Sequence, residues 1–551
     1  MHMPSPNGSR GGAWIKCTES GCLGEAVVER RCFAHSSQEQ RANYIQQQLA
    51  SRRAISLRGV RANAEMLDAA LDSPASDNGR HALSITLAGA ELLGARVYKD
   101  KTFLGSVDFS GATVLSQFEF TGCTFKGGVN GSFAFFNSGA PSWRQCIFET
   151  EVDFSFSHAD RVSIGFVDVE FRGTFRAEGV DGPMQFTRCK FARDVLCPAI
   201  SGPILSMDAC SIAGAFDLRD SQLGTFQATD VNFESAYQIG PLSANQCTLE
   251  RSRFGVRVTV AVVGTELKCD GAQFTSGGTI TVGSERLSLR DVALGGHLRL
   301  VGKLASDALP SVVSIANSDA GQMTFAQLSM AGCLFNGAHG LSSSIFEANV
   351  FFANTPRAFY ARRRCIADEI EWRASKGGWS GSRWKPLLPV STTPSRRPPA
   401  PRTPIDPSQI ANLYRELRRS HEARADQPGA ADFYYGEMEM RRLDPKTRTA
   451  DRLILNIYWV VSGYGLHALR SFACFGVLVL GSAALTRVHG FESGPVSSVD
   501  ALIFSLRSAL PGLRRASDLT PLGASVDIAE AVLGPLLFGL GLLAIRGRVR
   551  R

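Results

Sequence analysis

The sequence predicts a mainly β protein, in which a long β-solenoid is followed by a helical hairpin and two transmembrane α-helices. Three observations predict this architecture. Apolar residues recur every 20–23 positions through the middle of the chain, pentads with one small and one large apolar residue open that region, and two long apolar stretches lie near the carboxyl end. With 551 residues, 44% of them hydrophobic and 20% charged, the chain exceeds one ordinary core and is neither a disordered protein nor a polytopic transporter.

Charge is unevenly distributed along the chain. Residues 82–352 carry 20 Lys and Arg against 26 Asp and Glu, about −6, whereas the whole chain carries +8, so the remainder carries about +14. A basic remainder favours a membrane surface or another polyanion as the partner of the two ends. Residues 1–16 contain no apolar run, so we expect no cleavable signal peptide and reduced thiols for the 13 cysteines.

The first element, residues 1–36, is a candidate zinc knuckle. Cys17, Cys22, Cys32 and His35 together form the ligand set of a structural Cys3His zinc site. A segment this short has no core of its own, so a metal would supply its folding energy. The alternatives are reduced cysteines in a flexible leader and a catalytic thiol.

The next two elements are a cap and the solenoid itself. Residues 37–80 predict short helices that cover the open end of the solenoid, and residues 81–355 predict its coils. Leu87, Leu92 and Val97 lie five residues apart, a period that fits a coil with four short faces rather than a helix or a plain strand. About 13 coils are expected, each buried against its neighbours, as is typical of a solenoid. The recurring anchors are Phe125, Phe148, Phe171, Phe191, Ile212, Phe233, Phe254, Phe274 and Leu294, with Phe335 expected two turns later.

Six cysteines stand two residues before an apolar anchor, where the pentad has a small residue. A buried free thiol behaves as a small hydrophobe, so we expect these cysteines to form a core stack. A ladder of metal ligands is the alternative, but no histidine accompanies the thiols. The six are Cys123, Cys146, Cys189, Cys210, Cys247 and Cys333.

The pentads resemble the pentapeptide-repeat family, whose pattern is A-(D/N)-L-x-x. The matching segments are Ala90-Glu-Leu92, Ala95-Arg-Val97, Val107-Asp-Phe109 and Ala112-Thr-Val114. The resemblance implies a right-handed quadrilateral β-helix. Later coils depart from the pattern, because they prefer Phe and their lengths drift from 20 residues.

Beyond the solenoid the sequence predicts a helix over 356–374, a proline-rich linker over 375–407 and a helical hairpin over 408–452. The hairpin holds acids at Asp432, Glu437 and Glu439, but Glu437 and Glu439 diverge on a helix and no histidine lies at a catalytic spacing. His421-Glu422 lacks the second histidine of a metalloprotease motif. We therefore predict no catalytic residue there.

Residues 453–551 predict a membrane domain with spans at about 466–486 and 527–545 and an amphipathic helix over 501–513. Buried helices of a soluble domain are the alternative. Basic residues crowd before the first span and after the second, so the positive-inside rule places both termini in the cytosol. An aromatic belt of Tyr458, Trp459 and Tyr464 precedes the first span.

The whole arrangement is similar to that of bacterial membrane-associated pentapeptide-repeat proteins with a cysteine-rich start. The motifs that carry the similarity are DFYYGEMEMRR at 432–442, YWVVSGYG at 458–465 and the terminal span. The resemblance implies the fold and association with the inner (cell) membrane, and it implies no established activity. The order span, short helix, span is also similar to a two-helix ion-channel module, although no TVGYG-like filter is present.

The function expected from these observations is that of a non-enzymatic scaffold, anchored in a lipid bilayer, whose cytosolic β-helix binds an unknown protein partner. Structural zinc is the one cofactor expected. The alternative is an oligomeric pore with the β-helix as its sensor or regulatory domain, in which Glu530 and Arg507 line the path. Nucleic acid is not an expected partner, because a charge of about −6 over the solenoid is thin for a DNA mimic.

Overall fold

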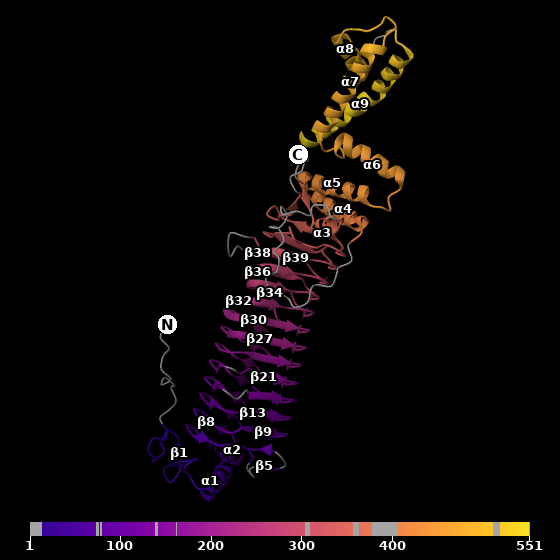
Figure 1. Ribbon diagram of the computed structural model, residues 1–551. Coiled ribbons are helices and arrows are strands. Elements are labelled where there is room, and N and C mark those ends of the chain that lie inside the picture. The colour runs from indigo at the N-terminus through magenta and orange to yellow at the C-terminus, as the bar shows by residue number, and fades with distance from the viewer. Residues whose placement is uncertain are drawn as a thin grey trace. The chain divides into compact units, whose positions relative to one another are not determined.

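The computed structural model describes residues 14–72, 76–77, 80–137, 141–160, 162–303, 309–355, 363–376, 405–510 and 518–549. The chain divides into two compact units, residues 1–333 with 345–351, and residues 334–344 with 352–551. Unit 1 contains a parallel β-solenoid of about 12 turns, and unit 2 contains the carboxyl-terminal helices (Figure 1). The predicted fold class is confirmed, with about 12 turns in place of the 13 expected.

Unit 1 opens with a small hairpin and two helices that precede the coils. Strands β1 (Ala26–Val28) and β2 (Arg31–Cys32) pair antiparallel. Helix α1 (Gln38–Ser51) starts at a capping box formed by Ser37 and Gln40. Helix α2 (Ala64–Leu71) is capped by Asn63, so both helices predicted for this region are present.

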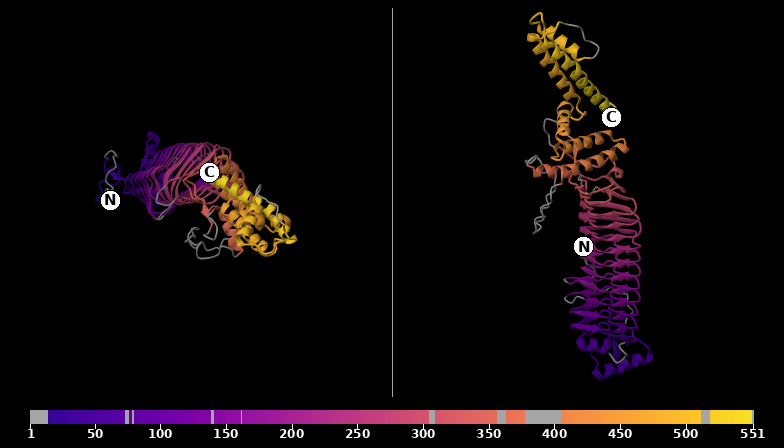
Figure 2. Two further views of the ribbon diagram at one scale, coloured as in Figure 1. Left: turned by 90° about the horizontal axis from the view of Figure 1, so that it is seen from above. Right: turned by 90° about the vertical axis from the view of Figure 1, so that its right-hand side faces the viewer.

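In the first coils each turn contributes one short strand to each of four sheets, and successive turns pair in parallel (Figure 2). Two of the sheets have eight and five strands. The eight-stranded sheet contains β3 (Ile55–Ser56), β7 (Ile85–Thr86), β11 (Val107–Asp108), β15 (Val129–Asn130), β19 (Val152–Asp153), β23 (Phe175–Arg176), β26 (Val195–Leu196) and β29 (Phe216–Asp217). The five-stranded sheet contains β4 (Arg61–Ala62), β8 (Glu91–Leu92), β12 (Thr113–Val114), β16 (Phe135–Phe136) and β20 (His158–Ala159).

The twelve-stranded sheet carries the predicted anchors. Phe103, Phe125, Phe148 and Phe171 are directly paired across neighbouring strands, and the register continues to Leu294. Phe335 belongs to unit 2, where it is buried outside any named strand. The sheet contains β5 (Ser76–Asp77), β6 (Arg80–His81), β10 (Thr102–Phe103), β14 (Thr124–Phe125), β18 (Ile147–Phe148), β22 (Glu170–Phe171), β25 (Lys190–Phe191), β28 (Ser211–Ile212), β31 (Asn232–Phe233), β33 (Arg253–Phe254), β35 (Gln273–Phe274) and β37 (Ala293–Leu294).

In the fourteen-stranded sheet the strands lengthen along the chain, so the four-sided section of the first coils does not persist. An alternating run such as VTVAVVGTELK in β34 offers every second side chain to the core over 11 residues, which favours one long strand over a corner. The sheet contains β9 (Arg96–Lys99), β13 (Phe118–Thr121), β17 (Pro141–Arg144), β21 (Ile164–Val167), β24 (Met184–Thr187), β27 (Ser201–Asp208), β30 (Ser221–Thr229), β32 (Gln238–Thr248), β34 (Val258–Lys268), β36 (Gly278–Ser288), β38 (Leu298–Gly302), β39 (Ser311–Ser314), β40 (Met323–Ala326) and β41 (Ile345–Phe346).

The core of the solenoid consists of stacked rings and thiols. Phe148 stacks on Phe171 with ring centroids 5.2 Å apart, and Phe171 stacks on Phe191 at 4.7 Å. All six cysteines of the predicted slot are buried and make no disulfide, which confirms their packing role.

In the described part of unit 2, the regular elements are α-helices, the short turn η1 (Leu341–Ser343) and one antiparallel strand pair, β42 (Ala353–Asn354) with β43 (Arg364–Cys365). The single helix predicted over 356–374 is wrong in part. Residues 356–362 lie outside the described residues, residues 364–365 are extended because they pair with β42, and helix α3 begins only at Ala367 and ends at Ser375. Of the predicted proline-rich linker, residues 377–404 also lie outside the described residues.

The remaining helices are α4 (Pro407–Ala423), α5 (Gln427–Leu443), α6 (Thr449–Ser462), α7 (Ala468–His489), α8 (Ser498–Ala509) and α9 (Pro521–Val549). Helices α4 and α5 form the predicted hairpin. Helix α6 was not expected as a separate element. Helix α7 and residues Pro521–Arg546 of α9 are long and apolar enough to cross a membrane, and α7, α8 and α9 pack on one another.

Candidate functional site

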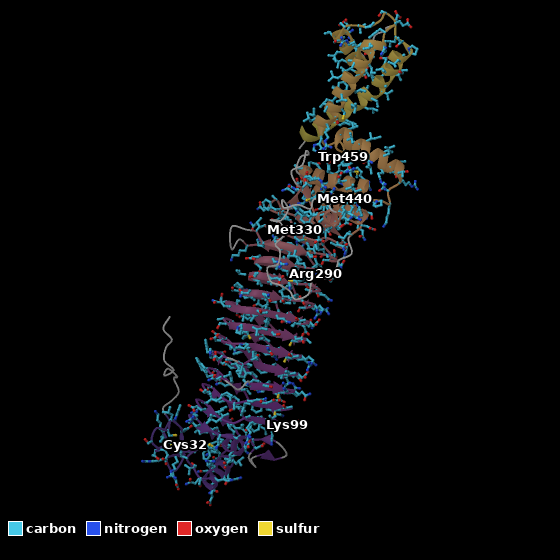
Figure 3. The ribbon with its side chains drawn as sticks, viewed as in Figure 1. Cys32, Lys99, Arg290, Met330, Met440 and Trp459 are labelled. Carbon is cyan, nitrogen blue, oxygen red and sulfur yellow. The ribbon has the colours of Figure 1, made fainter. Side chains whose placement is uncertain are left out.

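The predicted metal ligands converge in the part of unit 1 that precedes the coils, where Cys32 lies (Figure 3). The ligand atoms of Cys17, Cys22, Cys32 and His35 all lie within 4.8 Å of one another. The His35 Nδ1 atom is 3.4 Å from the Sγ atoms of Cys17 and Cys32, and the Sγ atoms of Cys22 and Cys32 are 3.6 Å apart. Ligands of a tetrahedral zinc ion would lie roughly 3.5–3.8 Å apart, so these four residues can bind a metal.

Local backbone geometry brings the four residues together. Cys17 follows the bridge between Lys16 and Glu25, and Cys32 ends β2. A Cβ at Gly24 would lie 2.8 Å from the Cβ of Cys32, so glycine is needed for this close approach. Four protein ligands leave no open position, which is typical of a structural rather than a catalytic metal site.

The thiols of this site differ in acidity. Burial raises the pKa of Cys17, but hydrogen bonds from the backbone of Glu19 and Cys32 and from His35 offset it, giving a pKa of about 6. Burial raises the pKa of Cys32 to about 12. A divalent cation would hold all three sulfurs as thiolates, because a coordinated thiol is deprotonated.

A second feature is an exposed cluster on the solenoid, the aromatic patch, formed by Phe133, Phe135, Phe156 and His158. Phe133 and Phe156 are 64% and 49% exposed, and their rings stack 5.2 Å apart. The rings of Phe135 and His158 lie 4.5 Å apart, and His158 pairs with Asp181 at 3.0 Å. Sequence reasoning missed this patch.

The backbone of the aromatic patch is strained. Phe133 and Phe156 have φ values of 57° and 59°, whereas the same corner is Gly89, Gly111 or Gly179 in the adjoining coils and the small or polar residues Ala199 and Asp220 in the next two. A left-handed conformation costs a residue with a Cβ roughly 1–2 kcal/mol relative to glycine. The signal that could have revealed the patch is a Phe at a corner where the other coils have Gly, Ala or Asp.

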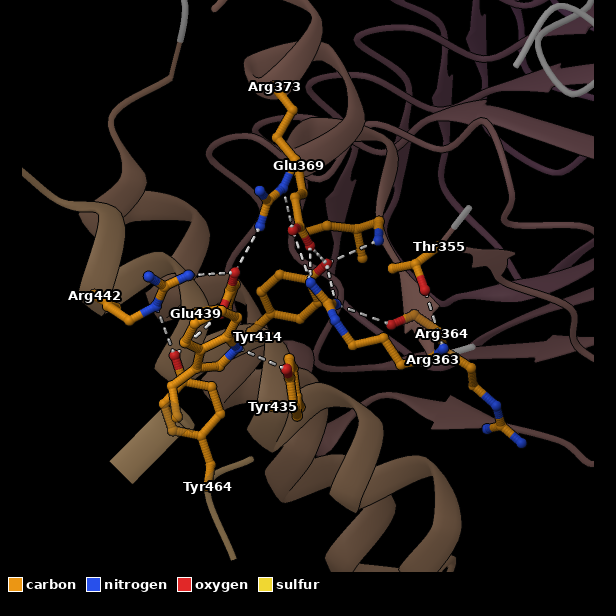
Figure 4. A network of polar contacts seen from close by, with 12 residues as sticks. Thr355, Arg363, Arg364, Glu369, Arg373, Tyr414, Tyr435, Glu439, Arg442 and Tyr464 are labelled. Atoms are coloured by element: carbon orange, nitrogen blue, oxygen red, sulfur yellow. Dashed lines mark hydrogen bonds and ion pairs between the residues drawn. The ribbon is translucent and has the colours of Figure 1, made fainter. Parts of the chain in front are cut away.

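Unit 2 contains a buried network of ion pairs centred on Glu369 (Figure 4). Both carboxylate oxygens of Glu369 accept hydrogen bonds of 2.7 Å from Arg363, and Tyr414 donates to one of them. Burial alone would raise the pKa of Glu369, but the charges of Arg363 and Arg373 lower it below its usual value. The carboxylate is therefore fully occupied by cationic partners and is not available for acid–base chemistry.

The acids singled out in the hairpin are held by different partners. Glu439 pairs with Arg373 and Arg442 and accepts a hydrogen bond from Tyr464, whereas Glu437 pairs with Arg415, Arg418 and Arg441. The divergence expected on a helix is confirmed, but both side chains are buried rather than solvated. Asp432 lies 3.9 Å from Arg364, and the His421 Nδ1 atom lies 2.8 Å from Asp426.

Helices α7, α8 and α9 have inverted polarity, with apolar side chains outside and polar ones inside. On α7, Leu469 and Val477 are 82% and 72% exposed. The buried polar residues come from all three helices and include Ser471, Ser482, Thr486, Ser505, Ser508 and Glu530. Helix α8 follows the same rule, because Leu502, Ile503 and Leu506 are exposed. The amphipathic helix predicted over 501–513 is too long, because α8 ends at Ala509 and Leu510 is extended, while residues 511–513 lie outside the described residues.

The two candidate pore residues are placed differently. Glu530 is fully buried in the bundle, whereas Arg507 is exposed on α8. Helix α6 has an exposed apolar face as well, made by Leu453, Ile454, Ile457 and Val460. Comparisons with protein-family models, with curated proteins and with solved structures found no match to this chain.

Proposed function

We propose that this protein is a membrane-anchored, non-enzymatic scaffold of the pentapeptide-repeat type, whose solenoid lies in the cytosol of a bacterium and binds a protein partner. The inverted polarity of α7, α8 and α9 carries this proposal. Water would favour the reverse arrangement, whereas lipid favours exposed Leu and Val around an interior of small and hydroxyl-bearing residues.

The flanks of the bundle support the same membrane assignment. The exposed apolar face of α6 follows Arg441, Arg442 and Lys446, which is the composition of a helix that lies on an anionic membrane surface. Basic residues before α7 and at the end of α9 favour a cytosolic location for both flanks.

The aromatic patch is the surface of the solenoid best suited to a protein partner. Its stacked rings are exposed, and its corner takes a left-handed backbone conformation that glycine adopts at lower cost. Exposed apolar clusters on soluble surfaces mark interaction sites, and strain is retained where function requires it.

Photo-crosslinking in cells tests the scaffold. A photoreactive phenylalanine analogue at Phe156 is expected to trap a discrete protein, whereas the same analogue at Tyr237, a more exposed aromatic of another coil, is not. Equal or absent products at both positions would contradict the proposal. Retention of the full chain in membranes after carbonate washing tests the anchor separately.

We also propose that the metal held by Cys17, Cys22, Cys32 and His35 is structural zinc. The thiolate-rich, four-ligand set matches zinc in number and type. Purified full-length protein is expected to contain about one zinc per chain, lost in Cys32→Ser and kept in Cys474→Ser, which alters a thiol of α7. A metal-free wild-type protein, or zinc unchanged in Cys32→Ser, would contradict this assignment.

An oligomeric pore is the second candidate. The observation that favours it is the placement of α8, a short helix packed between two candidate spans with a buried carboxylate beside it. Bilayers containing the full chain would then conduct, and protein lacking residues 453–551 would not. A monomeric protein that gives no current would exclude the pore and leave the scaffold.

A further inference from the structure

Glu530 is a buried carboxylate at the meeting point of α7, α8 and α9. Its side chain is fully buried and interacts with Ser482 of α7 and Ser505 of α8. Yet neither of its oxygens has a partner in hydrogen-bond geometry. The hydroxyls therefore lie beside the carboxylate without satisfying it.

The hydroxyl of Ser505 is unsatisfied as well. A buried serine or threonine in a helix commonly donates to a carbonyl of the preceding turn, as Thr486 does to Ser482 at 2.9 Å. Ser505 makes no such bond, although it is fully buried. Two buried polar side chains without hydrogen bonds cost free energy in a protein interior unless another group or an ion binds to them.

Among the residues that the structure describes, no basic side chain pairs with the carboxylate of Glu530. The charged group that acts on Glu530 is Asp527, an acid of the same helix, and Arg507 of α8 is exposed. An ionised carboxylate inside a bundle surrounded by lipid needs a compensating positive charge.

Backbone oxygens near Glu530 add to the negative potential. Gly534, one turn after Glu530, packs so closely on the end of α8 that a Cβ there would lie 2.3 Å from the carbonyl oxygen of Ala509. The last carbonyls of a helix lack helical donors and form the negative end of its dipole. Pro535 inside α9 also leaves the carbonyl of Ala531 without its helical donor.

We propose that Glu530, Ser482 and Ser505 form a binding site for a monovalent metal cation, Na⁺ or K⁺, inside the three-helix bundle. The site offers only oxygen atoms, which suits hard cations, and a single carboxylate, which one monovalent ion neutralises. Ca²⁺ sites in proteins use six to eight oxygens and usually several carboxylates. The inference rests on the proposed insertion of this bundle in a membrane.

Thermal unfolding of the full chain in lipid nanodiscs tests the site. At one ionic strength and pH, NaCl or KCl is expected to raise the unfolding temperature of the bundle by about 2–4 °C over choline chloride, with saturation. Glu530→Gln should abolish the rise. Ser505→Ala should leave the charge of the site unchanged but require a higher salt concentration for the same rise. Asp500→Asn, which removes an exposed acid of α8, should leave the rise unchanged.

Equal unfolding temperatures in the three salts would overturn the cation site. A transition that follows pH but not Na⁺ or K⁺ would also overturn it, because the carboxyl group would then carry a proton instead. If carbonate washing removes the wild-type chain from membranes, the proposed anchor fails, and that assay does not depend on the cation.

Discussion

Asp368 is a buried carboxylate of unit 2 without a cationic partner of its own in the described structure. It accepts a hydrogen bond of 2.9 Å from the backbone N–H of Phe335, and its second oxygen has no hydrogen bond. Burial raises its pKa to about 6, because the charged form loses water and the backbone N–H groups around it offset that loss only in part. Its neighbour Glu369 is equally buried, but two arginines hold its pKa low. The pKa values of these adjacent carboxylates on α3 are therefore shifted in opposite directions.

Asp368→Asn is expected to stabilise unit 2 at neutral pH. In the folded state the carboxyl keeps its proton until the pH rises through about 6, whereas in the unfolded state it loses the proton near 3.8. The contribution of Asp368 to stability is present below the lower value and is lost as the pH rises through the higher one. Denaturant unfolding should show no difference between variant and wild type near pH 3.5 and a gain on the order of 2–3 kcal/mol at pH 7.

Asp426→Asn is the matched control, because it should have the opposite effect. Burial raises the pKa of Asp426, but the N–H of Gly429, His421 and Arg364 more than offset this and lower it. The variant should lose stability at pH 7 and approach wild type in acid. The same slope for both variants would contradict the assignment of these shifts.

Glu369→Gln is expected to destabilise unit 2 by about 3–5 kcal/mol, because it leaves the buried charge of Arg363 without its counter-ion. Glu422→Gln breaks an exposed pair with Arg418 on α4 and should cost less than about 1 kcal/mol. Chemical denaturation followed by helix content measures both. A loss as small as that of Glu422→Gln would contradict the assignment of Glu369 as the counter-ion that the buried Arg363 requires.

At the scale of elements, the solenoid strands are too short to be stable alone. Most strands in the first coils have two residues, so their stability comes from the parallel neighbour and from the ring stacked beneath. This makes each coil dependent on the coils before and after it.

Phe171→Ala should therefore open the solenoid locally. The ring is fully buried between Phe148 and Phe191, and its removal is expected to cost about 3–5 kcal/mol. Hydrogen exchange should rise most in the coils around residues 148–191 and decline with distance. The exposed Phe135→Ala should change exchange little. Uniform exchange across all coils in Phe171→Ala would contradict nearest-neighbour stability.

The anchors were predictable because every coil gives them the same environment, so one spacing repeats from Phe125 to Leu294. The positions of the corners between faces were not predictable. A run such as residues 258–268 can bury its apolar side chains either as short strands joined by a corner or as one long strand, and the structure has the long strand. The four candidate metal ligands were predictable from residue type and short spacing. The Glu369 network was not predictable, because Arg363 and Tyr414 are far apart in the sequence and come into contact only in the folded chain. The aromatic patch was not predictable either, because Phe133 and Phe156 look like core residues in the sequence.

At the scale of the whole molecule, the charge distribution and the two apolar helices together favour a topology in which both flanks of the helices lie on the same side of the membrane. The excess of basic over acidic residues lies outside the solenoid, and basic residues are concentrated before α7 and after Ile545. Helices α7 and α9 are each long and apolar enough to cross a membrane. Two crossings return the chain to its starting side. In the proposed topology, the basic residues that flank α7 and α9 would face the anionic cytosolic leaflet.

Reporter fusions to the full chain test this topology. Green fluorescent protein after Arg551 is expected to fluoresce and alkaline phosphatase there to be inactive, because basic flanks remain in the cytosol. Gly494, between α7 and α8, supplies the internal control, since a Cβ there meets nothing within 4 Å and an insertion has space. Phosphatase inserted at Gly494 should be active. Activity after Arg551, or fluorescence at Gly494, would invert the orientation, and cytosolic signals at both positions would mean that the two helices do not cross.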